Sequence, residues 1–212
     1  MKHLNMKQIH SIILLLILSI NGHGKTLTIA IDLSGSNPLL KHENFSFAAA
    51  KYMTGEISKL KNGDNVTLQT FGARSDAMNQ LSYSFTISRR QKAASIAATI
   101  AKFIQSIPKR AELSQSSTNL IAWLEFTDGF DCEHAGQIIV ITDGLESSSY
   151  VDAKKLLDGS ATFPKPDVDL TGCSLTFYGL GAGLPAPWVK IVRNAWKDWV
   201  ASSGATFKAI IR

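Results

Sequence analysis

The chain has 212 residues, of which 45% are hydrophobic and 18% are charged, and its formal net charge is +5. This length and composition fit one globular domain with a sizeable core, and internal repeats and low-complexity tracts are absent. The tight basic clusters, Arg89–Lys92 and Lys109–Arg110, are typical of solvated helix ends, so no nucleic-acid partner is expected.

The first 24 residues predict a secretory signal peptide. Lys2 and Lys7 precede the apolar run Ile12–Ile20, and the small residues Gly22 and Gly24 suit cleavage after residue 24. An uncleaved anchor is the alternative, but the run is shorter than the roughly 20 residues of a membrane span. We therefore expect a signal peptide at residues 1–24 and one domain at residues 25–212, secreted or periplasmic. Contact with a membrane is expected only through the signal before cleavage.

Strand and helix patterns alternate along the rest of the chain. In chain order the sequence predicts a strand at 27–31, a helix at 43–60, strands at 65–71 and 81–87, helices at 89–107 and 118–126, a strand at 137–142, a helix at 150–157, a strand at 175–180, a helix at 187–202 and a strand at 205–211. The regular polar and apolar alternation at 81–87 indicates an antiparallel edge strand with one wet face. The predicted fold class is α/β, with a doubly wound, mostly parallel central sheet and helices on both faces.

A polar turn follows the first predicted strand. Asp32, Ser34 and Ser36 place one carboxylate and two hydroxyls on alternate positions, and such hard oxygen ligands suit magnesium or manganese rather than zinc or copper. Asp, Ser and Gly also form ordinary turns, so this pattern alone is weak. In a doubly wound sheet, however, ligands bind at the carboxyl ends of the strands, where the strand order reverses.

Two later segments add to this turn. Thr142-Asp143-Gly144 follows another apolar strand, and Thr118 precedes an apolar helical stretch. The ordered set Asp-x-Ser-x-Ser, Thr and Thr-Asp-Gly resembles the von Willebrand factor type A family, over essentially all of the chain after about residue 25. The resemblance implies a Rossmann-like fold and a metal-ion-dependent adhesion site. The residues implied as its metal site are Asp32, Ser34, Ser36, Thr118 and Asp143.

The resemblance also implies a role for each residue. Ser34 and Ser36 would bind Mg²⁺ or Mn²⁺ directly, Thr118 directly or through water, and Asp32 and Asp143 mainly through metal-bound water. An ion held in this way keeps an open position for an acidic side chain of a protein partner. We therefore expect a non-catalytic binding domain, either a monomer or part of an assembly. The sequence departs from the family at Ser116 and Ser117, where many relatives have glycines, which bears on the shape of the loop.

The chain has two cysteines, Cys132 and Cys173, each just before or at the start of a predicted strand. In an oxidising compartment such a pair predicts a disulfide, here at the sheet edge opposite the candidate metal site. Two free buried thiols are the alternative, and a zinc site that includes His134 lacks a clear fourth ligand.

Two other functions compete with a metal-dependent adhesin. A metal-free structural component of a bacterial envelope or mobile-element assembly would use the same scaffold without the ion. A serine hydrolase would need a base, and His42 is the only histidine near the serine turn.

Three further features have structural interpretations. Gly179–Gly183 resembles a dinucleotide loop imperfectly and is predicted to be a tight turn. Glu146, with the serines that follow it, lines the rim of the site or caps the helix expected near Tyr150. The stripe formed by Trp188, Val192, Ala195, Trp196 and Trp199 is predicted to face the core.

Overall fold

The computed structural model describes residues 24–73 and 81–211. The predicted signal peptide therefore lies outside the described residues, apart from Gly24. The strands are β1 (Thr26–Asp32), β2 (Asn65–Phe71), β3 (Ser82–Thr86), β4 (Gln137–Ile141), β5 (Ser174–Tyr178) and β6 (Thr206–Ile210). The main helices are α2 (Glu43–Ile57), α3 (Ala93–Ser106), α4 (Leu120–Phe126), α5 (Ala153–Leu157) and α6 (Ala186–Ser202).

The six strands form one sheet in the order β3-β2-β1-β4-β5-β6. All neighbouring pairs are parallel except β2 and β3, which are antiparallel. The predicted fold class is therefore confirmed, including the antiparallel edge strand. Because the chain builds the sheet outward from β1 in both directions, the strand order reverses between β1 and β4.

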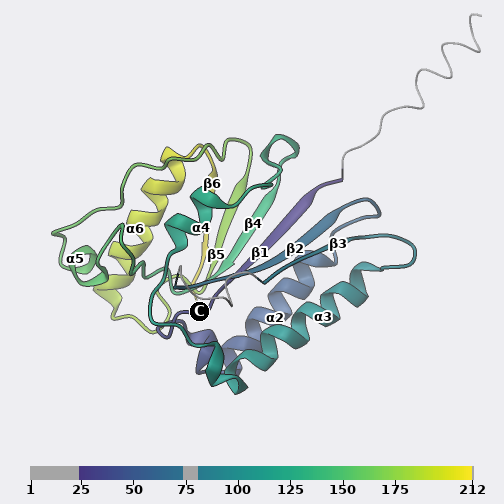
Figure 1. Cartoon of the computed structure of the whole chain (residues 1–212), viewed down its shortest axis with the longest axis horizontal. Coiled ribbons are helices and arrows are strands. Elements are labelled where there is room, and N and C mark those ends of the chain that lie inside the picture. Colours follow the sequence, from purple (N-terminus) through teal and green to yellow (C-terminus); the bar gives the residue numbers. More distant parts are fainter. Residues whose placement is uncertain (1–23, 74–80, 212) are drawn as a thin grey trace, which may run out of the picture.

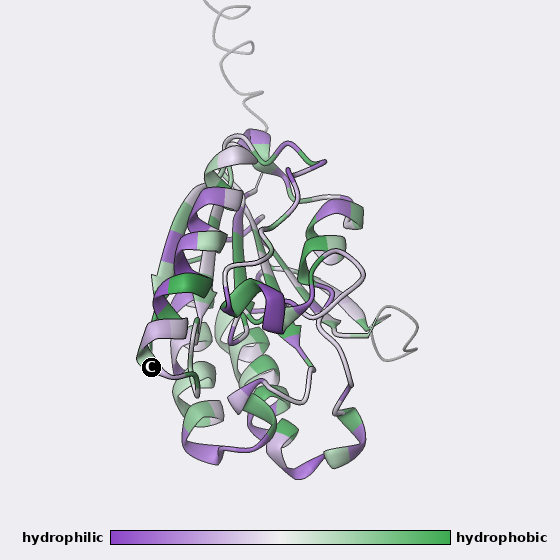
Figure 2. Ribbon diagram, turned by 90° about the vertical axis from the view of Figure 1, so that its left-hand side faces the viewer, coloured by the Kyte–Doolittle hydropathy of each residue, from purple (hydrophilic) through white to green (hydrophobic). Residues whose placement is uncertain are grey.

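Helices cover both faces of the sheet (Figure 1). Alternate residues of the central strands face opposite sides: Ile29 and Ile31 of β1 belong to the core beneath α2 and α3, whereas Ala30 belongs to the core beneath α4 and α6. Figure 2 shows the hydrophobic strands between the helical layers. Burial on both faces explains why β1 and β4 are almost continuously apolar.

Some helix boundaries differ from the prediction. The first helix ends at Ile57 rather than at residue 60, because Ser58–Leu60 form tight turns. The helix predicted from residue 89 begins at Ala93, after a turn in which the Ser88 hydroxyl accepts a hydrogen bond from the Gln91 N–H (3.0 Å). Such a hydroxyl competes with helix formation for the same backbone donor.

Most of the apolar stripe of α6 faces the core, and Ala195 is partly buried. Val192, Trp196 and Trp199 are buried, but Trp188 is 42% exposed. The exception lies in the first turn of the helix, just after the Pro185 N-cap.

Cys132 and Cys173 form a disulfide, as predicted, with a Cα–Cα distance of 4.5 Å. It joins the segment just before β4 to the residue just before β5, at the amino ends of these parallel strands. Among the described residues, no helix has the length and apolar character needed to cross a membrane.

Replacing both cysteines with serine is expected to lower the free energy of unfolding by about 3–4 kcal/mol. The disulfide spans 41 residues, and closing a loop of this size removes conformational entropy from the unfolded chain. Urea denaturation of the oxidised wild type and of the double variant measures the difference. Equal midpoints and equal slopes for the two proteins would contradict the expectation.

Candidate metal centre

The two aspartates of the predicted site lie at the carboxyl ends of neighbouring strands. Asp32 ends β1, and Asp143 comes two residues after β4. The strands are paired in parallel, with Ile31 opposite Ile141, so both carboxylates lie at the point where the strand order reverses. Both are buried, with exposed fractions of 0% and 1%.

The serine turn is fixed by hydrogen bonds to Asp32. Asp32 Oδ1 accepts a hydrogen bond from the Ser34 N–H (2.8 Å), and the hydroxyl oxygens of Ser34 and Ser36 lie 3.3 Å apart. The amide of buried Asn37 donates to the backbone carbonyls of Asp32 (2.7 Å) and Ile141 (3.2 Å). Asn37 therefore ties the two strand ends together, a role that no local sequence pattern indicates.

Hydrogen bonds also fix the turn after β4. The Thr142 hydroxyl donates to Asp32 Oδ2 (2.6 Å), and Asp143 Oδ1 accepts from the Leu145 N–H (2.9 Å). From the other side, the Gly181 N–H donates to the Asp143 carbonyl (2.7 Å). The segment Gly179–Gly183 is a tight turn, as predicted, and its hydrogen bond supports the backbone of Asp143.

The segment that carries Thr118 lies between these two turns. Gln115 pairs with the serine turn through two backbone hydrogen bonds. The Gly35 N–H donates to the Gln115 carbonyl (2.8 Å), and the Gln115 N–H donates to the Leu33 carbonyl (2.9 Å). Thr118 is 1% exposed and pairs with Ser147 through two backbone hydrogen bonds of 3.1 and 3.2 Å. The fold therefore brings together the three segments that carry the five predicted residues.

Glu146 is a third buried carboxylate beside this site. Its Oε2 accepts from the N–H groups of Leu120 (2.9 Å) and Ile121 (3.3 Å), so it caps α4. Of the two roles considered for Glu146, the cap of a helix near Tyr150 is wrong, because α5 begins at Ala153 and is capped by Asp152. Glu146 Oε1 is buried and has no hydrogen-bond partner among the described residues.

Burial makes these carboxylates hard to ionise. It raises the pKa of Asp32 to about 7, with a further contribution from the charge of Asp143, while the Thr142 and Ser34 hydrogen bonds oppose the rise. Burial also raises the pKa of Asp143, against hydrogen bonds from Leu145 and Ser36, and it raises the pKa of Glu146 to about 7. The ion pairs of the described residues include none of the three.

A hard divalent cation fits this donor set. Two buried, mutually repelling carboxylates need a positive charge, and the neighbouring hydroxyls offer neutral oxygen ligands. Within residues 24–73 and 81–211, no three carboxylates, imidazoles or thiolates converge on a common metal position. An ion here therefore needs the hydroxyls of Ser34, Ser36 and Thr118 as well as Asp32 and Asp143.

The metal-free protein is expected to lose stability as pH rises from about 4 to about 7. With the folded pKa of Asp32 raised from 3.8 to about 7, the unfolded state loses its proton first, so its free energy falls relative to that of the folded state in that window. Melting temperatures in EDTA, measured at about pH 5 and about pH 8, test the direction of this change. A smaller difference between the two pH values in Asp32→Asn would attribute the change to Asp32. A melting temperature that climbs with pH in EDTA would refute it.

The histidines do not support a serine nucleophile. His134 lies beside Asp131 (Nδ1 to Oδ1, 2.6 Å) near the amino end of β4, at the opposite edge of the sheet from the serine turn. In the part of the chain that the structure describes, no histidine forms a hydrogen bond with Ser34 or Ser36. The disulfide also excludes the zinc site considered for the two cysteines and His134.

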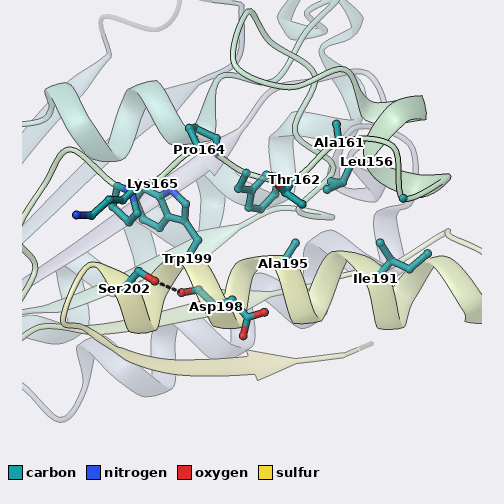
Figure 3. A pocket seen from close by; sticks show the side chains of 13 residues that line it. Leu156, Ala161, Thr162, Pro164, Lys165, Ile191, Ala195, Asp198, Trp199 and Ser202 are labelled. Carbon is teal, nitrogen blue, oxygen red and sulfur yellow. Dashed lines mark hydrogen bonds between the residues drawn. The ribbon is translucent and has the colours of Figure 1, made fainter.

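Two hollows differ in character. One of about 570 Å³ adjoins the Thr118 segment and is lined mainly by hydroxyl groups, including those of Ser116, Ser117 and Ser147. The other, of about 490 Å³, lies between α5, α6 and the loop that joins α5 to β5, and Trp199, Pro164 and Lys165 are among its lining residues (Figure 3). Neither hollow is lined by any of the five predicted site residues.

No protein-family model and no curated protein matches the chain. Solved structures match it at low identity. The VWA domain of SpRpn10 is 11% identical, with 89% of this chain and 88% of that one covered, at a TM-score of 0.43. The pilus adhesin SpaC from Lactobacillus rhamnosus GG, in an open conformation, is 12% identical, with 91% and 28% covered, at a TM-score of 0.50.

The fold is that of a von Willebrand factor type A domain. Manganese-loaded TRAP protein from Plasmodium vivax also matches, at 14% identity and a TM-score of 0.46, with 81% of this chain covered. The chain spans 63% of the length of that TRAP structure and 28% of the SpaC structure. At 12% identity, the likeness to the SpaC structure bears on the fold alone.

Proposed function

We propose that the chain is an exported, non-catalytic type A domain that binds a protein partner through a divalent cation. The ion is Mg²⁺ or Mn²⁺. Its ligands in this proposal, direct or through water, are Asp32, Ser34, Ser36, Thr118 and Asp143. The type A fold supports a protein-interaction role in general. The observation that carries the metal-dependent role is the meeting of the buried Asp32 and Asp143 with the serine turn at the reversal of strand order.

The proposal follows from the charges at the site. Neutral hydroxyls fill direct positions, and the aspartates are held by hydrogen bonds to Ser34 N–H, Thr142 and Leu145 N–H. A bound cation would therefore keep much of its positive charge toward the surface. A carboxylate of a partner would complete the coordination shell with a charge-assisted bond. Such binding needs neither a nucleophile nor a proton-transfer pair.

A peptide array tests the partner chemistry. The full chain is applied to peptides that carry one glutamate, each beside a matched peptide with glutamine, in Mg²⁺ and in EDTA. Binding that needs both glutamate and Mg²⁺ is expected. Binding that persists in EDTA would favour the metal-free structural role instead.

A further inference from the structure

Thr118 is the one predicted ligand that does not follow directly from a strand. The serine turn continues from β1 and Asp143 lies just after β4, whereas Thr118 lies just before the short helix α4. Asn119, the N-cap residue of α4, forms no side-chain cap, and its amide donates to the Gly72 carbonyl instead (2.9 Å). The first N–H groups of α4 therefore need an acceptor from elsewhere in the fold.

Glu146 supplies that acceptor. Its Oε2 accepts hydrogen bonds from the Leu120 N–H (2.9 Å) and the Ile121 N–H (3.3 Å), and the residue is fully buried. The next residue, Ser147, exchanges two backbone hydrogen bonds with Thr118 (3.1 and 3.2 Å). Two consecutive residues thus hold the segment 118–121, and they fix Thr118 against the turn after β4.

Hydrogen bonds also hold the turn that carries Glu146. Asp143 Oδ1 accepts from the Leu145 N–H (2.9 Å), and the Trp196 indole N–H donates to the Gly144 carbonyl (2.7 Å). Both bonds lie between Asp143 and Glu146 in the chain. The position of Asp143 therefore sets the position of Glu146, three residues later.

We propose that Glu146 is a positioning residue of the metal centre, which holds Thr118 within reach of the cation that Asp143 helps to bind. The inference rests on the proposed function and adds a residue to it. Glu146 acts through the backbone of residues 118–121 rather than on the ion, since no three carboxylates of the described residues converge on one metal position. Without its hydrogen bonds, Thr118 and the start of α4 would move relative to Asp143, and the metal affinity would fall.

Two variants of Glu146 separate the position of its oxygen atoms from its charge. Glu146→Gln keeps the length of the side chain and an acceptor oxygen, whereas Glu146→Asp keeps the carboxylate on a side chain shorter by one methylene. We expect Glu146→Asp to bind Mn²⁺ about 10-fold more weakly and Glu146→Gln to bind it nearly as tightly as the wild type. Titration calorimetry on the EDTA-treated full chain measures the affinities. The reverse order would show that the charge acts on the ion, and it would overturn the proposal.

A double-mutant cycle tests whether Glu146 acts through Thr118. Thr118→Val removes the hydroxyl and keeps the backbone N–H that pairs with Ser147. In the Thr118→Val background, Glu146→Asp is expected to cause little further loss of Mn²⁺ affinity, because the hydroxyl that it positions is already absent. An equal fold-loss in both backgrounds would overturn the proposal.

Two controls complete the experiment. Glu133→Asp makes the same change at an exposed position just before β4, at the other end of the sheet, and is expected to leave the Mn²⁺ affinity unchanged. Melting temperatures in EDTA report the capping of α4 by itself. If Glu146→Asp lowered the melting temperature but kept the wild-type affinity, Glu146 would cap α4 and nothing more, which would overturn the proposal.

The measurements distinguish this inference from the proposed function. If the wild type bound no Mn²⁺, the proposed function would fail and the role of Glu146 with it. If the wild type bound Mn²⁺ and Glu146→Asp bound it equally tightly, the role of Glu146 alone would fail.

Discussion

The Asp143→Asn variant is expected to bind Mn²⁺ about 10- to 100-fold more weakly than the wild type, without loss of stability. The asparagine oxygen can still accept the Leu145 N–H, so the turn after β4 is kept. The substitution also removes a buried charge that raises the pKa of Asp32. Titration calorimetry gives the affinity, and the melting temperature in EDTA gives the stability.

Asp128→Asn is the matched control for this variant. Asp128 is an exposed carboxylate between α4 and β4, near the amino end of β4 at the other end of the sheet, so its loss is expected to leave the Mn²⁺ affinity unchanged. If Asp143→Asn bound Mn²⁺ as tightly as this control, Asp143 would have no part in metal binding.

The Trp196→Ala variant is expected to lower the free energy of unfolding by about 3–5 kcal/mol. Trp196 is fully buried and packs against Phe163, Phe177 and Trp199, at ring-centroid distances of 4.6, 5.0 and 5.7 Å. Its Nε1–H also donates to the Gly144 carbonyl (2.7 Å), next to Asp143. Urea denaturation measures the loss.

Two further variants show where that energy comes from. Trp196→Phe keeps most of the ring packing but leaves the Gly144 carbonyl without its donor, at a cost of about 1–3 kcal/mol. Trp188→Ala removes an indole of the same helix that is 42% exposed and is expected to cost far less stability than Trp196→Ala. Similar losses at Trp188 and Trp196 would show that the burial pattern of α6 is wrong.

The positions of Asp32 and Asp143 could be predicted because each follows a continuous apolar strand. A parallel sheet brings such strand ends to one edge, and the register of Ile31 with Ile141 agrees. The antiparallel strand β3 could also be predicted, since the alternation at 81–87 is typical of an antiparallel strand with a solvated face.

The supporting residues could not be predicted in the same way. Asn37 looks like an ordinary turn residue, and its two carbonyl partners, on Asp32 and Ile141, become neighbours only when the sheet forms. Glu146 caps a helix that begins 26 residues earlier in the chain, whereas local sequence patterns indicate only caps close by. Tertiary contacts, not local propensity, decide both roles.

The most direct test of the account is titration of Mn²⁺ into the EDTA-treated full chain, with Ser34→Ala in parallel. The variant keeps the backbone N–H that donates to Asp32 and loses only the hydroxyl. We expect the wild type to bind one Mn²⁺ per chain and Ser34→Ala to bind it much more weakly. No heat from the wild type, or equal affinities for the two proteins, would contradict a cation held by the serine turn.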